Sequence, residues 1–382
     1  MTSICIVSQA AHGAMTGGRD GHAGGVERQT TMMARFLARR GHRVSLLVWD
    51  EGQPHDMIID GVRVIALCRR DAGLPGLRFF HPRWTSLAQA LGEADAEVYY
   101  QNCAEYVTGQ VALWARRHKR RFVYSVASDP ECDPRLPALR HLRERVLFRY
   151  GLRHADRILV QTDVQRLMLR RGFGLTGSVM PMPCAGTPDD EFVAPDPFRH
   201  PRRRVVWVGR ISAEKRLDWV LDIAAALPDV QVEIAGAPAD GDADAAAVIA
   251  RASALPNVTY LGKVARANMP DLYRDAAALL CTSVYEGFPN TFLEAWSHGV
   301  PVISTVDPDS LIATRGLGLV AADQSSLADA VRGCMSSPQS WREMSSRARR
   351  YYSERHTPDR ALPLFEQVFI EVAGPNAGLG AS

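Results

Sequence analysis

Short apolar runs alternate with amphipathic stretches along most of the chain. Residues 3–9, SICIVSQ, form an apolar run that predicts a buried strand. Residues 26–40 follow with apolar side chains at helical spacing, and Gly41 ends this predicted helix. Five further strands are predicted in this half, at residues 43–49, 62–67, 97–102, 121–127 and 157–162. This strand–helix–strand rhythm is typical of a parallel sheet covered by helices on both faces.

The rhythm stops at a proline-rich segment, residues 181–201, and then begins again. The second half predicts strands at residues 204–210, 230–236, 258–264, 277–283 and 301–305. We therefore expect two doubly wound α/β domains joined by a linker. The expected division is an N-terminal domain (1–185), a linker (186–201), a C-terminal domain (202–357), and a C-terminal helix and tail (358–382) that packs back on the first domain.

Composition agrees with a folded globular protein. The 382 residues are 46% hydrophobic and 23% charged, which excludes disordered and fibrous chains. No apolar run is long enough to span a bilayer, and the N-terminus lacks the basic region of a secretory signal. Seven scattered cysteines suggest neither a disulfide framework nor a zinc site. We expect a cytoplasmic protein.

Charge is distributed unevenly between the halves. Residues 1–180 contain 26 Lys and Arg against 17 Asp and Glu, whereas residues 181–382 contain 19 against 25. The excess in the first half includes two basic clusters, at residues 116–121 and 135–149. Such clusters favour either peripheral contact with an anionic membrane, at its inner face, or a solvated basic surface. Nothing in the pattern indicates nucleic acid as a partner.

One glycine-containing segment and one basic segment follow the first strand of the first and second half, respectively. Ligands bind at such places in doubly wound sheets. Gly24 and Gly25 precede a predicted helix, whose free N–H groups can hold a phosphate or a sugar hydroxyl; the alternative is a tight, flexible turn. Arg210 and Lys215 follow the strand at 204–210 and flank a short turn. Two cations near one point suit a diphosphate; the alternative is a solvated surface.

Two glutamates stand eight residues apart near the end of the second half. Pro289 separates Glu286 from the helix that contains Glu294, so the two do not share one helix. Glu286 is expected in a loop, where it either binds a ligand or is simply solvated. The stretch from Thr291 to Glu294 also matches a capping box, in which the glutamate only closes the helix N-terminus.

A third polar segment, residues 125–133, follows the strand at 121–127. Asp129, Glu131 and Asp133 lie close together there beside Cys132. Without a glycine turn or a histidine, such carboxylates are more typical of a solvated loop than of a metal site. We predict no metal site.

Three motifs occur in order along the chain: GGVER (24–28), VGRISAEKRLD (208–218) and EGFPNTFLEAWSHGVPVI (286–303). Together they resemble the family 4 glycosyltransferases, which are retaining nucleotide-sugar enzymes of the GT-B fold. The last motif is the most specific, because it joins the two glutamates with the glycine and proline between them. The resemblance implies two Rossmann-like domains whose parallel sheets face a central cleft, with the N-terminal domain on the acceptor side. It also implies a metal-independent retaining hexosyltransferase of polysaccharide or glycoconjugate biosynthesis, acting on a glycan or lipid-linked acceptor.

The family's roles carry over residue by residue. Arg210 and Lys215 would neutralise the leaving diphosphate, and Glu286 would contact the transferred sugar, so these three form the expected catalytic set. Glu294 would bind the ribose, and Lys263 and Val264 would lie against the base. The remaining residues implied for donor binding are Gly24, Gly25, Gly287, Phe288, Pro289, Asn290 and Thr291.

One position departs from the family pattern. Many members have a histidine after the strand at 121–127, placed to bind the donor sugar, and Ser128 stands there in this chain. Serine donates a hydrogen bond but carries no charge. Ser128 and Asp129 are therefore expected only as sugar or acceptor contacts, and a UDP-sugar is favoured over a GDP-sugar as donor. Two alternatives stay open: a sugar-nucleotide 2-epimerase, and a non-catalytic sugar-nucleotide-binding protein.

Overall fold

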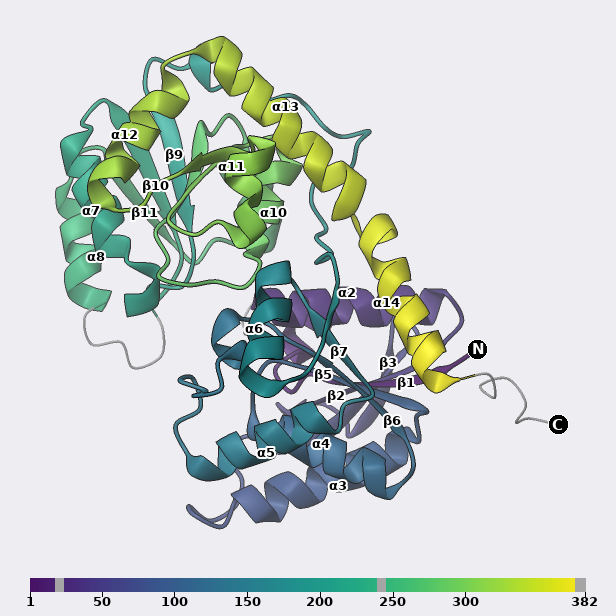
Figure 1. Ribbon diagram of the computed structural model, residues 1–382. Helices are drawn as coiled ribbons and strands as arrows, with labels where there is room; N and C mark the ends of the chain where they lie inside the picture. Colours follow the sequence, from purple (N-terminus) through teal and green to yellow (C-terminus); the bar gives the residue numbers. More distant parts are fainter. Residues whose placement is uncertain (18–23, 239–244, 375–382) are drawn as a thin grey trace. The chain divides into compact units, whose positions relative to one another are not determined.

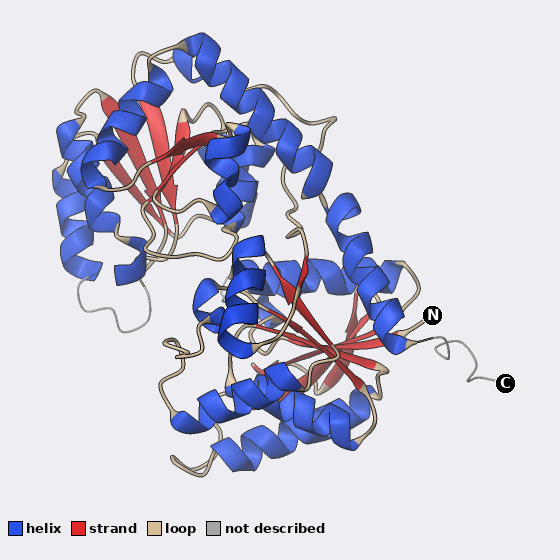
Figure 2. Cartoon of the chain, viewed as in Figure 1, coloured by secondary structure: helices blue, strands red, loops and turns tan. Residues whose placement is uncertain are grey.

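The computed structural model describes residues 1–17, 24–238 and 245–374, and its chain divides into two compact units (Figure 1). The first unit contains Met1–Met182 together with the segment from Ala361 onward, and the second contains Pro183–Arg360. In both units helices cover both faces of one sheet (Figure 2). The part of the tail after Gly374 lies outside the described residues.

The sheet of the first unit has the strand order β3-β4-β2-β1-β5-β6-β7-β8. Its strands are β1 (Ser3–Val7), β2 (Arg43–Asp50), β3 (Asp56–Ile59), β4 (Val62–Arg69), β5 (Val98–Asn102), β6 (Arg121–Ser125), β7 (Arg157–Val160) and β8 (Ser178–Val179). All neighbours pair in parallel except β3 and β4, which form an antiparallel hairpin. The hairpin turns at Asp60 and Gly61, both with positive φ. The central strand β1 is buried along its whole length, as its apolar sequence predicts.

Six helices between these strands complete the first unit's α/β layers. They are α1 (His12–Thr16), α2 (Gly25–Arg39), α3 (Thr85–Ala94), α4 (Tyr106–Arg117), α5 (Leu142–Arg153) and α6 (Asp163–Phe173). Helices α4 and α5 pack with their backbones close together: a Cβ atom on Gly109 would overlap the backbone of Leu147. Two glycines thus allow this approach, since Gly151 meets Thr108 in the same way.

Helix α14 (Pro358–Ala373) brings the end of the described chain onto the first unit. Its Phe369 ring is fully buried and lies edge-on to Tyr100 of β5, with ring centroids 5.5 Å apart. The Glu366 carboxylate accepts hydrogen bonds from His42 Nε2 at 2.9 Å and Arg40 Nε at 3.2 Å. Burial raises the pKa of Glu366, but these hydrogen bonds outweigh it, so the pKa of this carboxyl lies below its usual value.

The sheet of the second unit has the order β11-β10-β9-β12-β13-β14, and every neighbouring pair is parallel. Its strands are β9 (Arg203–Val208), β10 (Val230–Ala235), β11 (Val258–Gly262), β12 (Ala278–Cys281), β13 (Val302–Ser304) and β14 (Gly318–Val320). Its helices are α7 (Leu217–Ala226), α8 (Ala245–Ala254), α9 (Met269–Tyr273), α10 (Asn290–Ser297), α11 (Leu311–Arg315), α12 (Gln324–Met335) and α13 (Pro338–Arg355). This is the doubly wound order, in which the chain reverses direction across the sheet between β9 and β12.

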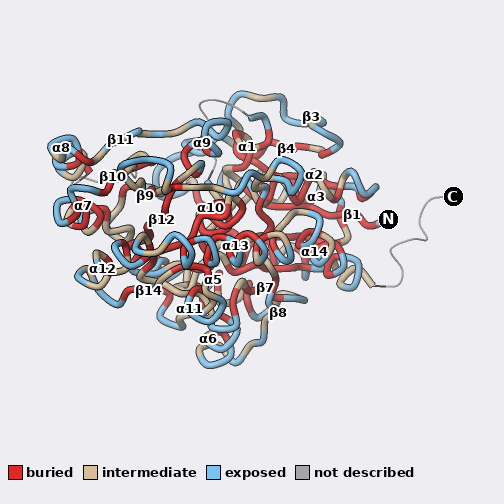
Figure 3. Tube along the Cα trace, turned by 90° about the horizontal axis from the view of Figure 1, so that it is seen from above, coloured by how far each residue is buried: buried red, intermediate tan, exposed pale blue. Residues whose placement is uncertain are grey.

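Buried residues follow the strands of both sheets and the inner faces of their helices (Figure 3). Six of the eight residues of helix α10 are buried. Trp341 of α13 closes the second core and donates its indole N–H to the carbonyl of Ala277 at 2.7 Å. Within the described residues, no helix is both long and apolar enough to span a membrane.

Candidate functional site

The second unit places its polar residues at the topological switch point. Arg210 and Lys215 follow β9, and Ser283 and Glu286 follow β12, the two strands between which the chain reverses direction. Ligands of doubly wound sheets bind beyond the carboxyl ends of the strands at this point. The sheet therefore brings three residues predicted to act in catalysis to the ends of two adjacent strands.

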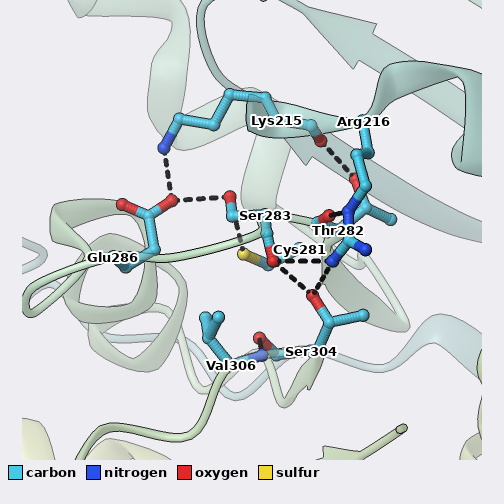
Figure 4. Close-up of polar contacts among 9 residues, drawn as sticks. Lys215, Arg216, Cys281, Thr282, Ser283, Glu286, Ser304 and Val306 are labelled. Atoms are coloured by element: carbon cyan, nitrogen blue, oxygen red, sulfur yellow. Dashed lines mark hydrogen bonds and ion pairs between the residues drawn. The ribbon is translucent and has the colours of Figure 1, made fainter. Parts of the chain in front are cut away.

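Lys215 and Glu286 meet directly at this place (Figure 4). The Lys215 ammonium forms an ion pair with Glu286 Oε1, and Ser283 Oγ donates to the same oxygen at 2.6 Å. Both charged side chains are partly accessible, at 26% and 17% of their side-chain area. A lysine ammonium has three N–H donors, so two remain for a ligand beside the pair.

Arg216 joins the loops that carry this ion pair (Figure 4). Its Nε donates to the carbonyl of Thr282 at 2.7 Å, and its Nη2 donates to that of Ser283 at 2.9 Å. In return, Thr282 Oγ1 donates to the carbonyl of Lys215 at 2.6 Å. The loop after β9 and the loop after β12 are thus held as one structure. Arg216 was not among the predicted site residues, because nothing distinguishes it in sequence from the chain's many other arginines.

Arg210 is exposed at the start of the loop after β9. Its charge reaches Glu214 in the short 3-10 helix η4 (Ala213–Lys215). Burial raises the pKa of Glu214, but local hydrogen bonds and the charges of Arg210 and Lys215 outweigh it and lower that pKa. Both predicted cations therefore act on one point of this loop.

Glu294 lies on α10, away from the ion pair of Lys215 and Glu286. Its carboxylate accepts hydrogen bonds from Arg266 Nη1 at 2.5 Å and from Tyr273 Oη at 3.2 Å, and the residue is only 8% exposed. Burial and the neighbouring charge of Glu294 raise the pKa of Tyr273 well above its usual value. The Glu294 side chain is thus buried, whereas that of its partner Arg266 is exposed.

The capping-box interpretation of Glu294 is wrong. Helix α10 begins at Asn290 with Pro289 as its N-cap, so Thr291 lies inside the helix and cannot cap it. The proline moves the helix start, and Glu294 turns to partners from η5 (Arg266–Asn268) and α9 instead. No sequence pattern pointed to these two partners.

The other residues predicted for donor binding in this unit lie after β12 and after β11. Gly287, Phe288 and Pro289 are buried between β12 and α10, and Phe288 packs against Trp296 of that helix. Asn290 and Thr291 form the first turn of α10. Lys263 is exposed and Val264 half-buried; they directly follow β11, at the edge of the sheet.

In the first unit, Gly24 is the N-cap of α2 and Gly25 its first residue. A Cβ atom on Gly24 would overlap the Glu27 carboxylate, which lies back against this helix end. The positive end of α2 therefore already has an acidic neighbour, a favourable arrangement for the helix dipole. Residues 18–23 of the same motif lie outside the described residues.

The acidic segment after β6 differs from its prediction as a solvated loop. Glu131 and Cys132 of η2 (Asp129–Cys132) are buried, and Ser128 Oγ donates to Glu131 Oε1 at 3.2 Å. Asp129 accepts a hydrogen bond from Gln165 of α6 at 3.0 Å. Only Asp133, paired with Arg135, fits the solvated description. Within residues 1–17, 24–238 and 245–374 no group of three metal-ligating side chains gathers, and all seven cysteines are free.

Comparisons with known proteins agree with this geometry. Residues 202–337 match the family model described as glycosyl transferases group 1, and residues 24–185 match the glycosyl transferase 4-like domain. The two matches together cover most of the chain. It belongs to the group 1 glycosyltransferases. The resemblance inferred from the three sequence motifs is thereby confirmed.

Relatives of this glycosyltransferase are similar along most of their length. The D-inositol 3-phosphate glycosyltransferase of Mycobacterium sp. (strain JLS) is 27% identical over 324 residues, which cover 77% of this chain and 73% of that protein. The structure of sucrose-phosphate synthase from Thermosynechococcus elongatus has a TM-score of 0.78 at 20% identity and covers 97% of this chain and 98% of its own. Anabaena HepE in complex with UDP and glucose has a TM-score of 0.74 at 16% identity, covering 96% and 99%. The predicted GT-B fold is confirmed.

Proposed function

We propose that this glycosyltransferase transfers a hexose, with retention of anomeric configuration, from a nucleotide diphosphate sugar to a glycan or lipid-linked acceptor. The observation that carries the proposal is the meeting of Lys215 and Glu286, with Arg210 nearby, at the strand ends where the sheet of the second unit switches direction. A UDP-sugar is the favoured donor, and the likeness to HepE, whose structure holds UDP and glucose, supports this choice.

In the proposed reaction the bond between the sugar's anomeric carbon and the diphosphate oxygen breaks. The oxygen gains negative charge, which Lys215 and Arg210 stabilise without a metal ion. The acceptor hydroxyl bonds to the anomeric carbon on the same face, and the leaving phosphate takes its proton. Glu286 binds the sugar hydroxyls while it fixes Lys215, and the first amides of α10 after Phe288 add hydrogen-bond donors.

The nucleoside part of the donor is proposed to lie between α10 and the end of β11. Glu294 would accept hydrogen bonds from the ribose, and its hydrogen bond with Arg266 orients the carboxylate. The backbone at Lys263 and Val264 would lie against the base. In the first unit, Gly24 and Gly25 would approach the donor through backbone amides.

A panel of sugar nucleotides tests this proposal. All compounds are added at one common concentration, and a donor present at about 100 times its dissociation constant raises the free energy of unfolding by about 2.7 kcal/mol. Weaker binders raise it less at the same concentration, so the true donor stands out by its melting temperature. Turnover of that donor is then followed with and without an acceptor. Transfer only with an acceptor supports the proposal. Conversion to a 2-epimer without one, or binding without any turnover, supports one of the alternatives instead.

We also propose a peripheral contact with anionic membrane through the first unit. Leu142 and Val146 of α5 are exposed, at 74% and 55%, and so is Phe80 at 59%. The Arg143 guanidinium lies over the Phe79 ring at 4.8 Å, which places the start of α5 beside the segment with Phe80. Exposed apolar side chains next to arginines suit a bilayer surface with anionic headgroups. The basic residues of the two clusters are Arg116, Arg117, Lys119, Arg120, Arg121, Arg135, Arg140, Arg143, Arg145 and Arg149.

Cosedimentation with phosphatidylglycerol vesicles tests this contact. The unaltered protein is expected to bind at low salt and to dissociate as salt rises. Leu142→Ser should weaken binding, whereas Ile58→Ser, which changes an equally exposed apolar side chain on β3, should not. Salt-insensitive binding, or equal effects of the two variants, would argue against this surface.

A further inference from the structure

Glu131 is a buried carboxyl group at the carboxyl end of β6 in the first unit, where it is 4% exposed. Its two oxygens have different partners. Oε2 accepts from Tyr124 Oη at 2.5 Å and from the amide of Ala127 at 3.1 Å, whereas Oε1 accepts from Ser128 Oγ at 3.2 Å. The side of the carboxyl group that faces Ser128 is therefore chemically distinct from the side that is fixed in the core.

This arrangement gives Ser128 two possible roles toward a ligand. When Glu131 is ionised it has no proton, so the serine hydroxyl donates to Oε1 and leaves its lone pairs for the ligand. When Glu131 is protonated, the proton belongs on Oε1, because Tyr124 and Ala127 both donate to Oε2. The acid then donates to Ser128, and the hydrogen of the serine hydroxyl is free to point at the ligand.

Both forms are accessible near neutral pH. Burial raises the pKa of Glu131 to about 7, against the hydrogen bonds from Tyr124, the Ala127 amide, Ser128 and the Ala104 backbone that favour the charged form. The titratable groups around it are Tyr124 of β6, Cys103 after β5, and Cys132 and Asp129 of η2. Burial raises the pKa of the phenol and of both thiols, so these three stay neutral at pH 7.

We propose that Ser128 and Glu131 form a hydroxyl–carboxyl pair that binds a hydroxyl group of the sugar substrate. Ser128 touches the sugar, and Glu131 is a positioning residue that sets whether Ser128 donates or accepts the hydrogen bond. The inference rests on the proposed function, because the family resemblance places Ser128 where many relatives have a sugar-binding histidine. Where many relatives have a histidine, which changes its own charge with pH, this chain has a serine hydroxyl. Whether that hydroxyl donates or accepts a hydrogen bond is set by Glu131 beside it.

The variant Glu131→Gln mimics the state of the pair in which Glu131 is protonated. Its amide oxygen is required by Tyr124 and Ala127, so its NH2 group must face Ser128 and donate to it. The glutamine thus holds Ser128 as a donor at every pH. Asp133→Asn makes the same chemical change in the same segment, at a carboxylate that is paired with Arg135 rather than with Ser128.

Calorimetric titration with UDP-glucose between pH 5.5 and 8.5 tests the pair. The dissociation constant of the unaltered protein and of Asp133→Asn should change about five- to tenfold across this range, the size of one hydrogen bond. Glu131→Gln should show no such change, and its affinity at pH 8.5 should match that of the unaltered protein at pH 5.5. UDP alone, which lacks the sugar, should bind the unaltered protein and Glu131→Gln equally at each pH.

The outcomes separate this inference from the function on which it rests. Failure of the unaltered protein to bind UDP-glucose would overturn the proposed UDP-sugar donor, and the pair with it. Binding whose pH dependence survives in Glu131→Gln would overturn the pair alone. If Glu131→Gln does not fold, Ser128→Ala replaces it in the test, because this variant leaves the buried carboxyl group in place. UDP-glucose binding to Ser128→Ala should then be independent of pH. Binding that still changes with pH would also overturn the pair.

Discussion

Replacing Lys215 with alanine removes the cation assigned to the leaving diphosphate and leaves the rest of its loop in place. The loop does not depend on the lysine side chain, because Arg216 and the hydroxyl of Thr282 hold its backbone to the end of β12. The change leaves Glu286 with its hydrogen bond from Ser283 and without its cation. Lys215→Ala is therefore expected to affect chemistry much more than folding.

The expected loss of folding stability is smaller than the expected loss of transition-state stabilisation. The ion pair is partly solvated, with 26% and 17% of the two side chains exposed, so its loss should lower the free energy of unfolding by at most about 1 kcal/mol. In the transition state the leaving oxygen carries new charge, and losing one preorganised donor there costs about 3–4 kcal/mol, a hundred- to thousandfold in turnover. Lys215→Arg should recover only part of this, because a planar fork does not replace a compact ammonium.

The assay is initial-rate kinetics with the true donor, together with thermal unfolding of each variant. Arg332→Ala serves as the control, because it removes a surface cation of the same unit that pairs with Asp329 three residues away. The control should keep both its turnover and its melting temperature. Near-normal turnover in Lys215→Ala would refute the placement of the diphosphate, and a large loss of stability would refute the assignment of the effect to chemistry.

Three further changes have distinct expected outcomes. Glu294→Gln should raise the KM for the donor about tenfold with little change in kcat, because a ribose contact is made equally before and during reaction; a fall in kcat alone would contradict this role. Ser128→Ala should lose no more than about tenfold in turnover at pH 7, and a thousandfold loss would show that this hydroxyl takes part in the chemistry itself. Glu366→Gln should destabilise the protein by about 1–3 kcal/mol at pH 7, since it removes the ionised acceptor of the hydrogen bonds from Arg40 and His42. The pKa of Glu366 is lowered in the folded protein, so this contribution is present above its usual value of 4.5 and is lost as pH falls through the folded pKa. Denaturant unfolding at pH 7 and pH 3 should therefore show the difference from the unaltered protein shrinking at the lower pH.

The elements that could be predicted are those with a strong apolar signal. Strand β1 has five buried apolar or small residues in a row, and its neighbours β2 and β5 are similarly buried. The strands missed were β3, β8 and β14, which have four, two and three residues and lie at sheet edges. Such strands bury little apolar surface, so their sequences resemble loops. The hairpin turn at Asp60-Gly61 was the one local signal available for β3.

The site was predictable where one motif supplies a residue and its neighbours, and unpredictable where partners come from distant segments. Arg210, Lys215 and Glu286 follow strands whose ends meet because the sheet is parallel. Arg266 reaches Glu294 across 28 residues and belongs to a short 3-10 turn without any pattern. Glu131 was misjudged for a related reason: its acidic neighbours suggested solvent, whereas Tyr124, seven residues earlier, covers it. Tertiary packing, which local sequence does not encode, decided both cases.

Helix α14 has a consequence for the order in which the protein folds during synthesis. The contact between Arg40 and Glu366 joins residues 326 positions apart, and the whole second unit is made between them. The ribosome therefore finishes the sheet of the first unit long before it supplies the helix that covers part of that unit. Until then, the surface under Phe369, including Tyr100, is open to solvent and to other chains. Folding of the first unit is thus completed only after the second unit has been synthesised, and until then its uncovered apolar surface can contact other chains.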